Sequence, residues 1–481
     1  MDPYALKKCL EILTDYLEYS NYSLESRLHN RDDKHFIPQK TYSVIIQDLR
    51  GIIRWFNKIQ FATQKTLRAL NLGSITTLQR SELYYCVYCM HWKHVSHKYL
   101  QKEFDDLQAT FPDHTIPVWN SLLFQFLEKF SHFSWEIALK NKPLSEKISI
   151  SQAVPSFFVE HLIPVMSEQK IQANAKAMNP FKDHNFITLR IVLDKGNDEK
   201  WVTLTRDKCL QYMHENGIKT KIDSDIPFLI HIPMDQRNLV SKSQLYQSNK
   251  IIFQDKSAVI ACLLIDPQPM ELILDVAAAP GMKTRLIQEL TLFQSVIISG
   301  DIHRDRLKKT KKLLDQLNTK NTHLIQWDGA KLPLRVGVNS ERPLFDKILL
   351  DAPCSGSGTF LNDPEMKWHQ NKHILLKNVI IQEKILKQLK NYIQMGTTLV
   401  YATCSLYPEE GEYQINKLIN KPWFQDLTPQ PLIKGISPPY FINESLKTLI
   451  STQEKRIIGL GRIFPAKHHT QGFFFAKFTR Y

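Results

Sequence analysis

The spacing of hydrophobic positions predicts helices throughout residues 1–145. Four leucines from Leu6 to Leu17 recur every three or four positions, which places them on one face of a helix. Asp2-Pro3, just before them, is a typical N-cap and first-turn pair. Similar amphipathic stretches cover residues 42–61, 81–100 and 119–139. Because this part of the chain contains almost no glycine, we expect an N-terminal all-α domain built as a helical bundle.

The pattern becomes mixed after residues 141–144, which we interpret as a linker. Helices are predicted within residues 151–168 and 207–216. Apolar, partly β-branched runs at residues 186–192 and 228–232 are typical of strands. We therefore expect a small α+β module over residues 146–245.

From residue 246 onward, short apolar runs alternate with helical patterns. Strands are predicted at residues 272–276, 296–300, 323–327, 346–350 and 398–402. Helices are predicted at residues 283–293, 303–318, 373–394 and 411–420. Strand and helix in series indicate an α/β, Rossmann-like domain over residues 246–481, with a mostly parallel sheet and helices on both faces. Two closing runs, at 459–465 and 472–478, predict an antiparallel hairpin.

Composition narrows the class of protein. A chain of 481 residues is long for a single core and fits these three domains. Its 62 Lys and Arg against 48 Asp and Glu give a formal charge of +14, which favours a polyanionic partner such as nucleic acid. We expect no membrane partner, because no apolar stretch reaches the roughly 18 residues needed to span a bilayer. The first residues lack the pattern of a secretory signal, and seven cysteines favour reduced thiols in a cytoplasmic protein.

A glycine-containing turn follows the first strand of the α/β domain. Its residues are Ala277, Ala278, Ala279, Pro280, Gly281, Met282 and Lys283. Small side chains let the backbone approach a ligand, Gly281 can take a positive φ, and the next helix begins with free N–H groups. Open α/β sheets bind ligands at this edge of the sheet. A loop with one glycine is also explained as a purely structural turn, so the loop by itself leaves both interpretations open.

Two acids at the next strand ends favour a cofactor. Asp301 ends the second strand, 20 residues after Gly281, where a carboxylate can accept both ribose hydroxyls of an adenosine-type cofactor. Asp328 ends the third strand, where we expect the adenine edge. Each acid taken alone could be a helix N-cap. Together, the three strand-end features predict S-adenosyl-L-methionine as the cofactor.

Two cysteines lie in turns after the last two strands. Cys354 follows Asp351-Ala352-Pro353, and Cys404 lies between Thr403 and Ser405. A thiolate that adds to carbon 6 of a pyrimidine makes carbon 5 nucleophilic toward a methyl sulfonium. Thiols beside a methyl donor therefore predict methylation of a pyrimidine carbon, with Asp351 able to hydrogen-bond the polar edge of the ring. We expect the other isolated cysteines, Cys9, Cys209 and Cys262, to be small buried hydrophobes.

Cys86, Cys89, His91 and His94 have a spacing that suggests zinc. No second CxxC pair occurs, and ligands on one continuous helix do not easily surround a tetrahedral ion. We therefore expect no metal site.

The three blocks around Gly281, Cys354 and Cys404 resemble the RsmB/NOP (Sun) family of RNA cytosine-5 methyltransferases. Residues 253–258, 363–368 and 462–474 add further similarity, so the resemblance covers roughly residues 246–481. It implies a class I methyltransferase fold with a seven-stranded sheet. Residues 146–245 resemble, more weakly, the family's smaller RNA-binding subdomain. Residues 1–145 look like the NusB-like RNA-binding extension of bacterial members that modify 16S ribosomal RNA, through helicity and position alone.

The resemblance implies roles by position. Cys404 would be the nucleophile, and Cys354 would promote release of the methylated RNA. Residues Ala277 to Lys283, with Asp301, Asp328 and Asp351, would contact S-adenosyl-L-methionine or the target base. Met282 stands where the family usually has a second glycine, so its side chain must point away from the cofactor or the loop must shift.

The resemblance implies a protein that acts on RNA, with small-subunit ribosomal RNA as the substrate, and we expect a monomer. The target base must leave its stack to admit the thiol. Four lysines from Lys308 to Lys312 could contact phosphates, and Phe360, Trp368 and Tyr407 could stack on the base, although a solvated helix face and core packing explain them equally well. A transfer RNA methyltransferase and a non-catalytic RNA-binding assembly factor are the alternatives. The presence of both cysteines disfavours the latter, and also a DNA methyltransferase that uses the Pro-Cys thiol.

Overall fold

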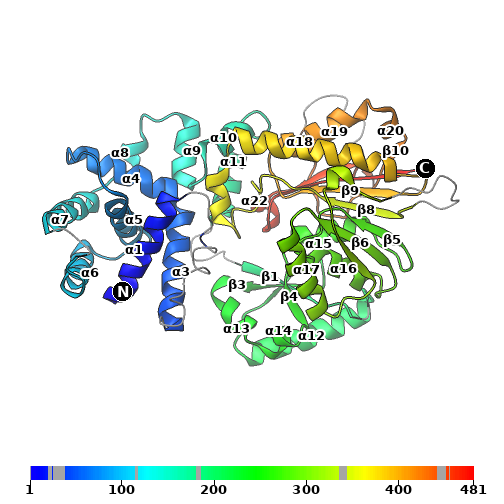
Figure 1. Cartoon of the computed structure of the whole chain (residues 1–481), viewed down its shortest axis with the longest axis horizontal. Helices are drawn as coiled ribbons and strands as arrows, with labels where there is room; N and C mark the ends of the chain where they lie inside the picture. The colour runs from blue at the N-terminus through cyan, green and yellow to red at the C-terminus, as the bar shows by residue number, and fades with distance from the viewer. Residues whose placement is uncertain are drawn as a thin grey trace. The chain divides into compact units, whose positions relative to one another are not determined.

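The structure is a computed structural model of the chain (Figure 1). It describes residues 2–19, 24, 38–113, 117–179, 186–194, 196–334, 344–440, 451–453 and 456–481. The chain forms two compact units. The first contains Met1–Glu160 together with Asp363–Trp368, and the second contains His161–Asn362 and His369–Tyr481.

The first unit is helical, as its sequence predicts. Its described helices are α1 (Pro3–Glu18), α3 (Gln39–Arg54), α4 (Phe56–Ala69), α5 (Thr77–Trp92), α6 (His97–Thr110), α7 (Pro117–Ser131), α8 (Trp135–Leu139) and α9 (Leu144–Gln152), followed by α10 (Ser156–Leu162) at the boundary. The Asp2 carboxylate caps α1 by accepting the N–H of Ala5 at 2.9 Å. The leucine face of α1 is fully buried at Leu6, Leu10 and Leu13.

Three stretches that the periodicity predicts as single helices are each two helices. Residues 119–139 divide between α7 and α8, which begins after its Ser134 cap. Residues 42–61 divide between α3 and α4 at Trp55, whose ring stacks on Trp92 at 5.2 Å between ring centroids. Residues 81–100 divide between α5 and α6, because the Ser96 hydroxyl accepts the N–H of Tyr99 and begins a new helix. Apolar periodicity continues across such breaks, and therefore the pattern does not locate them.

A short segment from far along the chain completes the helical unit. Asp363–Trp368 belongs to this unit, and most of it lies in the 3-10 helix η4 (Pro364–His369). Trp368 Nε1 donates to the Ile53 carbonyl at 2.7 Å, and Lys367 Nζ donates to the Arg54 carbonyl at 2.9 Å. Carbonyls in the last turn of a helix lack intrahelical partners, so these donors satisfy the end of α3.

The second unit contains a small antiparallel sheet in the order β2-β3-β1-β4. Its strands are β1 (Phe186–Ile191), β2 (Lys221–Ile222), β3 (Leu229–Pro233) and β4 (Ile251–Phe253), accompanied by helices α11 (Glu168–Ala177), α12 (Glu199–Glu215), α13 (Arg237–Ser241) and α14 (Gln244–Gln247). Both predicted strands are present. The helix predicted within 207–216 is the second half of α12, which begins at the Asp198 cap. The single helix predicted within 151–168 is wrong: α9 ends at Gln152, its C-cap Ala153 has a φ of +49°, and α10 follows Pro155.

The large sheet has the order β10-β14-β9-β8-β5-β6-β7, and β13 pairs with β14. The strands are β5 (Leu272–Asp275), β6 (Val296–Asp301), β7 (Thr322–Gln326), β8 (Lys347–Asp351), β9 (Thr398–Thr403), β10 (Leu427–Pro429), β13 (Leu460–Ile463) and β14 (Phe473–Arg480). The five predicted strands lie within one residue of their expected bounds and are parallel to one another. The predicted hairpin is β13 and β14. The sheet has eight described strands against the seven expected, since β13 adds to the seven-strand path.

Helices α15 (Lys256–Ile265), α16 (Met282–Leu290), α17 (Arg304–Gln316), α18 (Lys372–Leu389), α19 (Glu412–Ile419), α20 (Pro422–Gln425) and α22 (Pro465–His468) accompany this sheet (Figure 1). Alternate strand residues enter two separate hydrophobic clusters. Ile273 and Leu349 lie in one cluster, whereas their neighbours Leu274 and Ile348 lie in the other. This alternation shows that both faces of the sheet are covered. Among the described residues, no helix is long and apolar enough to cross a membrane.

A buried ion pair joins the small sheet to helix α16. Arg190 on β1 and Glu289 on α16 are both fully buried, and Arg190 Nη2 donates to Glu289 Oε1 at 3.2 Å. The N–H of Leu193 donates to Glu289 Oε2 at 2.7 Å. Breaking a buried charge pair is costly, because the remaining charge has no partner. The small sheet therefore helps to fix α16, the helix that follows the predicted cofactor loop.

Candidate active site

The order of strands places the predicted cofactor loop at a switch point of the sheet. β5 lies between β8 and β6, so the chain continues to one side through β6 and β7 and later returns on the other side through β8 and β9. Such a point, beyond the carboxyl ends of the strands, is where open α/β sheets bind ligands. The loop from Ala277 to Gly281 connects β5 to α16 at this point.

Gly281 is required by the geometry of this loop. Its φ is +99°, and a Cβ at this position would lie 2.9 Å from the Thr310 side chain. Its N–H donates to the Ala278 carbonyl at 2.7 Å, and the N–H of Ala278 donates to the Gly300 carbonyl at 2.8 Å. The Ala279-Pro280 peptide bond is cis. The loop is therefore tied to β6 and delivers the first N–H groups of α16 to the switch point.

The loop residues differ in their exposure. Ala278 is buried, Ala277 and Ala279 are half-buried, and Pro280 is exposed. The Met282 side chain packs against a small cluster of Val192, Ile252 and Leu317. The Met282 side chain is therefore accommodated by apolar contacts, although the family resemblance predicts a glycine at this position.

Asp301 and Asp328 follow neighbouring strands, as predicted. Asp301 is 4% exposed, and its Oδ1 accepts the N–H of His303 at 3.0 Å. Asp328 is exposed, and its Oδ1 accepts the N–H of Ala330 at 2.9 Å, which makes it the cap of the 3-10 helix η3 (Gly329–Lys331). Both acids therefore carry the local capping bonds that an Asp at a strand end commonly makes.

Lys283 and Asp351 form an ion pair at the carboxyl ends of β5 and β8. The Lys283 Nζ lies 2.5 Å from Asp351 Oδ2, and their side chains are 19% and 22% exposed. Burial lowers the pKa of Lys283, but the adjacent Asp351 carboxylate raises it by a larger amount. The pKa of Lys283 therefore lies above its usual value. The lysine is therefore a fixed positive charge at the site.

The two predicted cysteines lie together. Cys354 Sγ and Cys404 Sγ are 3.1 Å apart, and both residues are partly exposed free thiols. The hydrogen bond to Cys404 raises the pKa of Cys354 well above its usual value, and burial adds to this effect. Cys354 consequently keeps its proton at neutral pH, and the geometry suits donation from its thiol to the Cys404 sulfur.

A buried arginine anchors the loop that contains Cys404. Arg462 is fully buried, and its Nη1 donates to the Ser405 carbonyl at 2.8 Å and its Nη2 to the Tyr407 carbonyl at 3.2 Å. The same Nη2 lies 2.6 Å from Glu412 Oε2, which is also fully buried. Gly358, in the Cys354 loop, donates its N–H to the Cys404 carbonyl at 2.9 Å.

Sequence reasoning missed two residues near the cofactor loop. Asp275 ends β5 and is 1% exposed; its Oδ2 accepts the Thr284 hydroxyl at 2.7 Å, whereas its Oδ1 has no hydrogen-bond partner among the described residues. Burial raises the pKa of Asp275 to about 6. Arg306 lies 3.3 Å from Asp301 Oδ2 and donates to the Ala279 carbonyl at 3.1 Å. An acid at the end of an apolar strand could have indicated Asp275, but nothing in the sequence distinguishes Arg306 from its basic neighbours.

The other candidates differ in burial and in the unit to which they belong. Phe360 and Tyr407 are fully buried, and Trp368 belongs to the helical unit, so core packing explains these aromatics. The four lysines from Lys308 to Lys312 are exposed on α17. Cys86 and Cys89 are buried in α5, and the described residues contain no group of His, Cys, Asp and Glu arranged to hold a metal.

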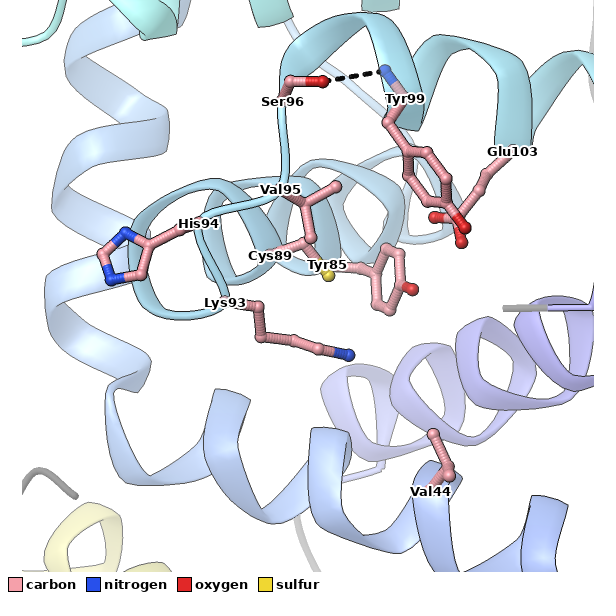
Figure 2. Close-up of a pocket in the computed structure, with 9 residues that line it drawn as sticks. All are labelled: Val44, Tyr85, Cys89, Lys93, His94, Val95, Ser96, Tyr99 and Glu103. Atoms are coloured by element: carbon pink, nitrogen blue, oxygen red, sulfur yellow. Dashed lines mark hydrogen bonds between the residues drawn. The ribbon is translucent and has the colours of Figure 1, made fainter.

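A cavity of about 570 Å³ lies in the helical unit, and none of the predicted site residues lines it. Figure 2 shows Tyr85 and Cys89 of α5, Tyr99 and Glu103 of α6 and Val44 of α3 around it, with Lys93 to Ser96 on the connection. Lys93 is already paired with Asp48 at 2.9 Å. Burial raises the pKa of Cys89 to about 12, so this thiol stays protonated. We give the cavity no part in the chemistry of the two thiols.

The fold and the site together define a class: a Rossmann-like domain with a glycine-containing loop and two strand-end acids at the switch point of its sheet, and a pair of adjacent thiols at the ends of the neighbouring strands. Residues 262–479 match the family model described as 16S rRNA methyltransferase RsmB/F. This part of the chain is therefore similar to the methyltransferase domains that the model describes.

Individual proteins agree with this assignment. The chain is 34% identical over 227 residues to a probable ribosomal RNA small subunit methyltransferase B of Synechocystis, covering 47% of each chain. It is 31% identical over 242 residues to a 28S rRNA (cytosine-C(5))-methyltransferase of Mus musculus, covering 49% of this chain and 29% of the mouse protein. The matches thus span about half or less of these relatives' own lengths. A solved structure described as PH0851 has the same fold over 100% of this chain and 99% of its own, with a TM-score of 0.73 and 21% identity.

Proposed function

We propose that this protein transfers a methyl group from S-adenosyl-L-methionine to carbon 5 of a cytosine in ribosomal RNA. The substrate that we propose is 16S RNA. The distance of 3.1 Å between the sulfurs of Cys354 and Cys404 carries the proposal. A single buried cysteine would be explained by packing. Two partly exposed thiols in contact, at the carboxyl ends of adjacent strands and beside the cofactor loop, match a chemistry that needs one sulfur to attack and a second group to assist release. The family of the domain and the names of its relatives support the same substrate class.

The cofactor would lie across the carboxyl ends of β5, β6 and β7. The loop from Ala277 to Met282 and the first N–H groups of α16 would face its methionine part, with Lys283 nearby. Asp301 would accept the ribose hydroxyls, and Asp328 would lie at the adenine edge. The buried Asp275 Oδ1, which has no partner among the described residues, supports a donor from the ligand in this region. When bound, the cofactor supplies an electrophilic methyl group.

The reaction would begin with the Cys404 sulfur. Its thiolate attacks carbon 6 of the flipped cytosine, and a carbon–sulfur bond forms while electron density moves to carbon 5. Carbon 5 then takes the methyl group. Loss of the carbon 5 proton to a base restores the ring double bond as the carbon–sulfur bond breaks, and the thiolate leaves. Asp351, held by Lys283, would hydrogen-bond the polar edge of the ring and keep it in register.

Cys354 would act in the release step. Its thiol keeps its proton and faces the sulfur that must leave, so it can stabilise the departing thiolate by a hydrogen bond. This proposed role rests on the raised pKa of the Cys354 thiol and on its position against the Cys404 sulfur.

RNA would be held mainly by the second unit. Residues 1–160 contain 19 Lys and Arg and 17 Asp and Glu, so almost all of the net charge of +14 lies in the rest of the chain. Cationic side chains supply most of the salt-dependent affinity for a phosphate backbone. We propose that the helical residues 1–145, which look like a NusB-like extension, position the protein on the RNA. They would supply little of the electrostatic attraction to the phosphates.

One experiment tests the proposed function directly. Purified protein, labelled S-adenosyl-L-methionine and a 16S RNA transcript should give 5-methylcytosine at a defined position, and a 23S transcript and a transfer RNA should not. Bisulfite sequencing of RNA from cells that lack the protein should show the same position unmethylated. If only transfer RNA is methylated, transfer RNA is the substrate and the ribosomal proposal is wrong. If no RNA is methylated, the enzymatic function is refuted.

A further inference from the structure

A buried carboxylate lies beneath the Cys354 loop. Glu410 ends the 3-10 helix η6 (Pro408–Glu410), six residues after Cys404, and is fully buried. Its Oε1 accepts the backbone N–H of Ser355 at 2.8 Å, and its Oε2 accepts the Ser355 hydroxyl at 2.5 Å. One carboxylate therefore holds both the backbone and the side chain of the residue next to Cys354.

A glutamine extends this hold to the other side of Cys354. Gln382 on α18 is fully buried, and its Nε2 donates to Glu410 Oε1 at 3.3 Å and to the Pro353 carbonyl at 2.8 Å. The residues before and after Cys354 are thus both fixed through the Glu410 carboxylate, directly at Ser355 and through Gln382 at Pro353. Charge-assisted hydrogen bonds of this kind are stronger than neutral ones and fix geometry well.

The backbone of Glu410 is tied to the strand that leads to Cys404. The Tyr401 hydroxyl donates to the Glu410 carbonyl at 2.8 Å, and the Thr403 hydroxyl donates to the same carbonyl at 3.3 Å. The hydroxyls of Ser355 and Ser405 are also 3.3 Å apart. Glu410 therefore bridges the two loops: its carbonyl is fixed to β9, and its side chain reaches the loop after β8.

The two cysteines differ in how they depend on Glu410. The Cys404 loop has a second, independent anchor, since Arg462 with Glu412 holds the carbonyls of Ser405 and Tyr407. On the Cys354 side, the two flanking residues are held by Glu410 at Ser355 and by Gln382 at Pro353, and Gln370 also donates to the Ser355 carbonyl at 2.9 Å. Further along this loop, the N–H of Gly358 donates to the Cys404 carbonyl. Removal of the Glu410 carboxylate should therefore displace Cys354 more than Cys404.

We propose that Glu410 is a positioning residue that holds the Cys354 thiol against the Cys404 sulfur and so governs release of the methylated RNA. This proposal rests on the proposed function, because it assumes that Cys404 forms the adduct and Cys354 assists its breakdown. Because Glu410 is fully buried, it would act through the loop rather than on the substrate or the cofactor. Release needs the two sulfurs in contact, whereas attack on the base needs only Cys404.

The test compares attack with release in Glu410→Ala and Glu410→Gln. Multiple turnover by Glu410→Ala should fall roughly 10- to 100-fold, the usual effect of a displacement of about 1 Å. Methyl transfer in a single turnover should stay within about twofold of the unmodified protein, and a covalent RNA adduct should accumulate on a denaturing gel. Glu410→Gln keeps an oxygen for the Ser355 N–H and should show a smaller effect of the same kind. If Glu410→Ala does not fold, Glu410→Gln and Ser355→Ala, which loses only the hydroxyl contact, provide the same comparison.

Three controls separate the possible failures. Glu383→Gln changes a half-exposed glutamate of α18 that pairs with Lys417, and it should leave turnover unchanged. Cys354→Ala, measured in parallel, should trap the adduct. If it does not, the release role fails and the Glu410 proposal fails with it. If Cys354→Ala traps the adduct but folded Glu410 variants release RNA normally, the Glu410 proposal alone is overturned. An equal loss of single-turnover transfer and multiple turnover would likewise overturn it, since that result indicates general damage to the site.

Discussion

The sulfurs of Cys354 and Cys404 are 3.1 Å apart, although the residues are 50 positions apart in the chain. The contact follows from the pairing of two parallel strands, in which Asp351 of β8 lies opposite Ala402 of β9. Each cysteine comes two or three residues after this pair, in the turn that leaves the sheet. Strand register therefore brings the thiols together, and the buried groups below the turns keep them there.

Replacement of Cys404 should abolish methyl transfer. We expect Cys404→Ala to show no product in a single turnover and to bind S-adenosyl-L-methionine with nearly unchanged affinity by calorimetry, because the sulfur contributes to attack rather than to the cofactor loop. Cys209→Ala is the matched control, since this cysteine is buried in the same unit away from the site and should cost stability only. Retained methylation by Cys404→Ala would show that another group is the nucleophile.

Replacement of Cys354 should stop the reaction after attack. The variant Cys354→Ala keeps the attacking sulfur but loses the thiol that faces it, so a protein–RNA adduct should survive denaturing electrophoresis. The double variant with Cys404→Ala should lose the adduct. Free RNA in both cases would contradict the release role.

Asp301 should contribute directly to cofactor affinity. Asp301→Ala should weaken binding of S-adenosyl-L-methionine by roughly 1.5–3 kcal/mol, the range for losing hydrogen bonds to a charged group. Asp305→Ala is the control, because the Asp305 side chain is 89% exposed on α17. Calorimetric titration measures both variants, and equal affinities for Asp301→Ala and the control would reject the ribose contact.

The buried carboxylate of Asp275 should make stability depend on pH. Its pKa in the folded protein is about 6, against 3.8 for the ordinary group, and burial is the main cause. Because the folded pKa is the higher one, the favourable contribution is complete below about pH 4 and is lost as the pH rises through 6. Asp275→Asn should therefore stabilise the ligand-free protein at pH 7.5 by up to about 3 kcal/mol, and much less at pH 4. Thermal unfolding at the two pH values measures this difference, and a gain independent of pH would contradict the assignment.

The segment Asp363–Trp368 should stabilise the helical unit. Trp368→Ala removes the hydrogen bond to Ile53 and the ring contact with Phe56, whose centroid lies 5.7 Å away. We expect a loss of roughly 2–4 kcal/mol, seen as faster hydrogen exchange in α3 and α4. The control Trp423→Ala removes a tryptophan that packs on Phe424 in the second unit, so its effect should appear around α20 instead. Unchanged hydrogen exchange in α3 would show that the segment does not stabilise the helical unit.

The sequence by itself determined the α/β sheet, the glycine-containing loop after β5 and the placement of two cysteines in turns after β8 and β9. These features depend on local rules: apolar runs of strand length, a glycine where φ must be positive, and polar turns around thiols that the core would not need. The sequence did not predict the helix breaks at Trp55 and Ala153, because hydrophobic periodicity continues across a break. The division into three domains and the roles of the site residues stay predictions.

Only the tertiary structure decided which groups surround the thiols. The supports of the two cysteine loops are Glu410, Gln382 and Arg462, which come from separate elements. Their contacts with Ser355, Glu410 and Ser405 join residues 55, 28 and 57 positions apart. Similarly, the pairing of Arg306 with Asp301 and the insertion of Asp363–Trp368 into the helical unit have no local signature. A buried polar side chain is stabilised by partners that folding brings to it, so its role is fixed by three-dimensional packing rather than by its neighbours in the chain.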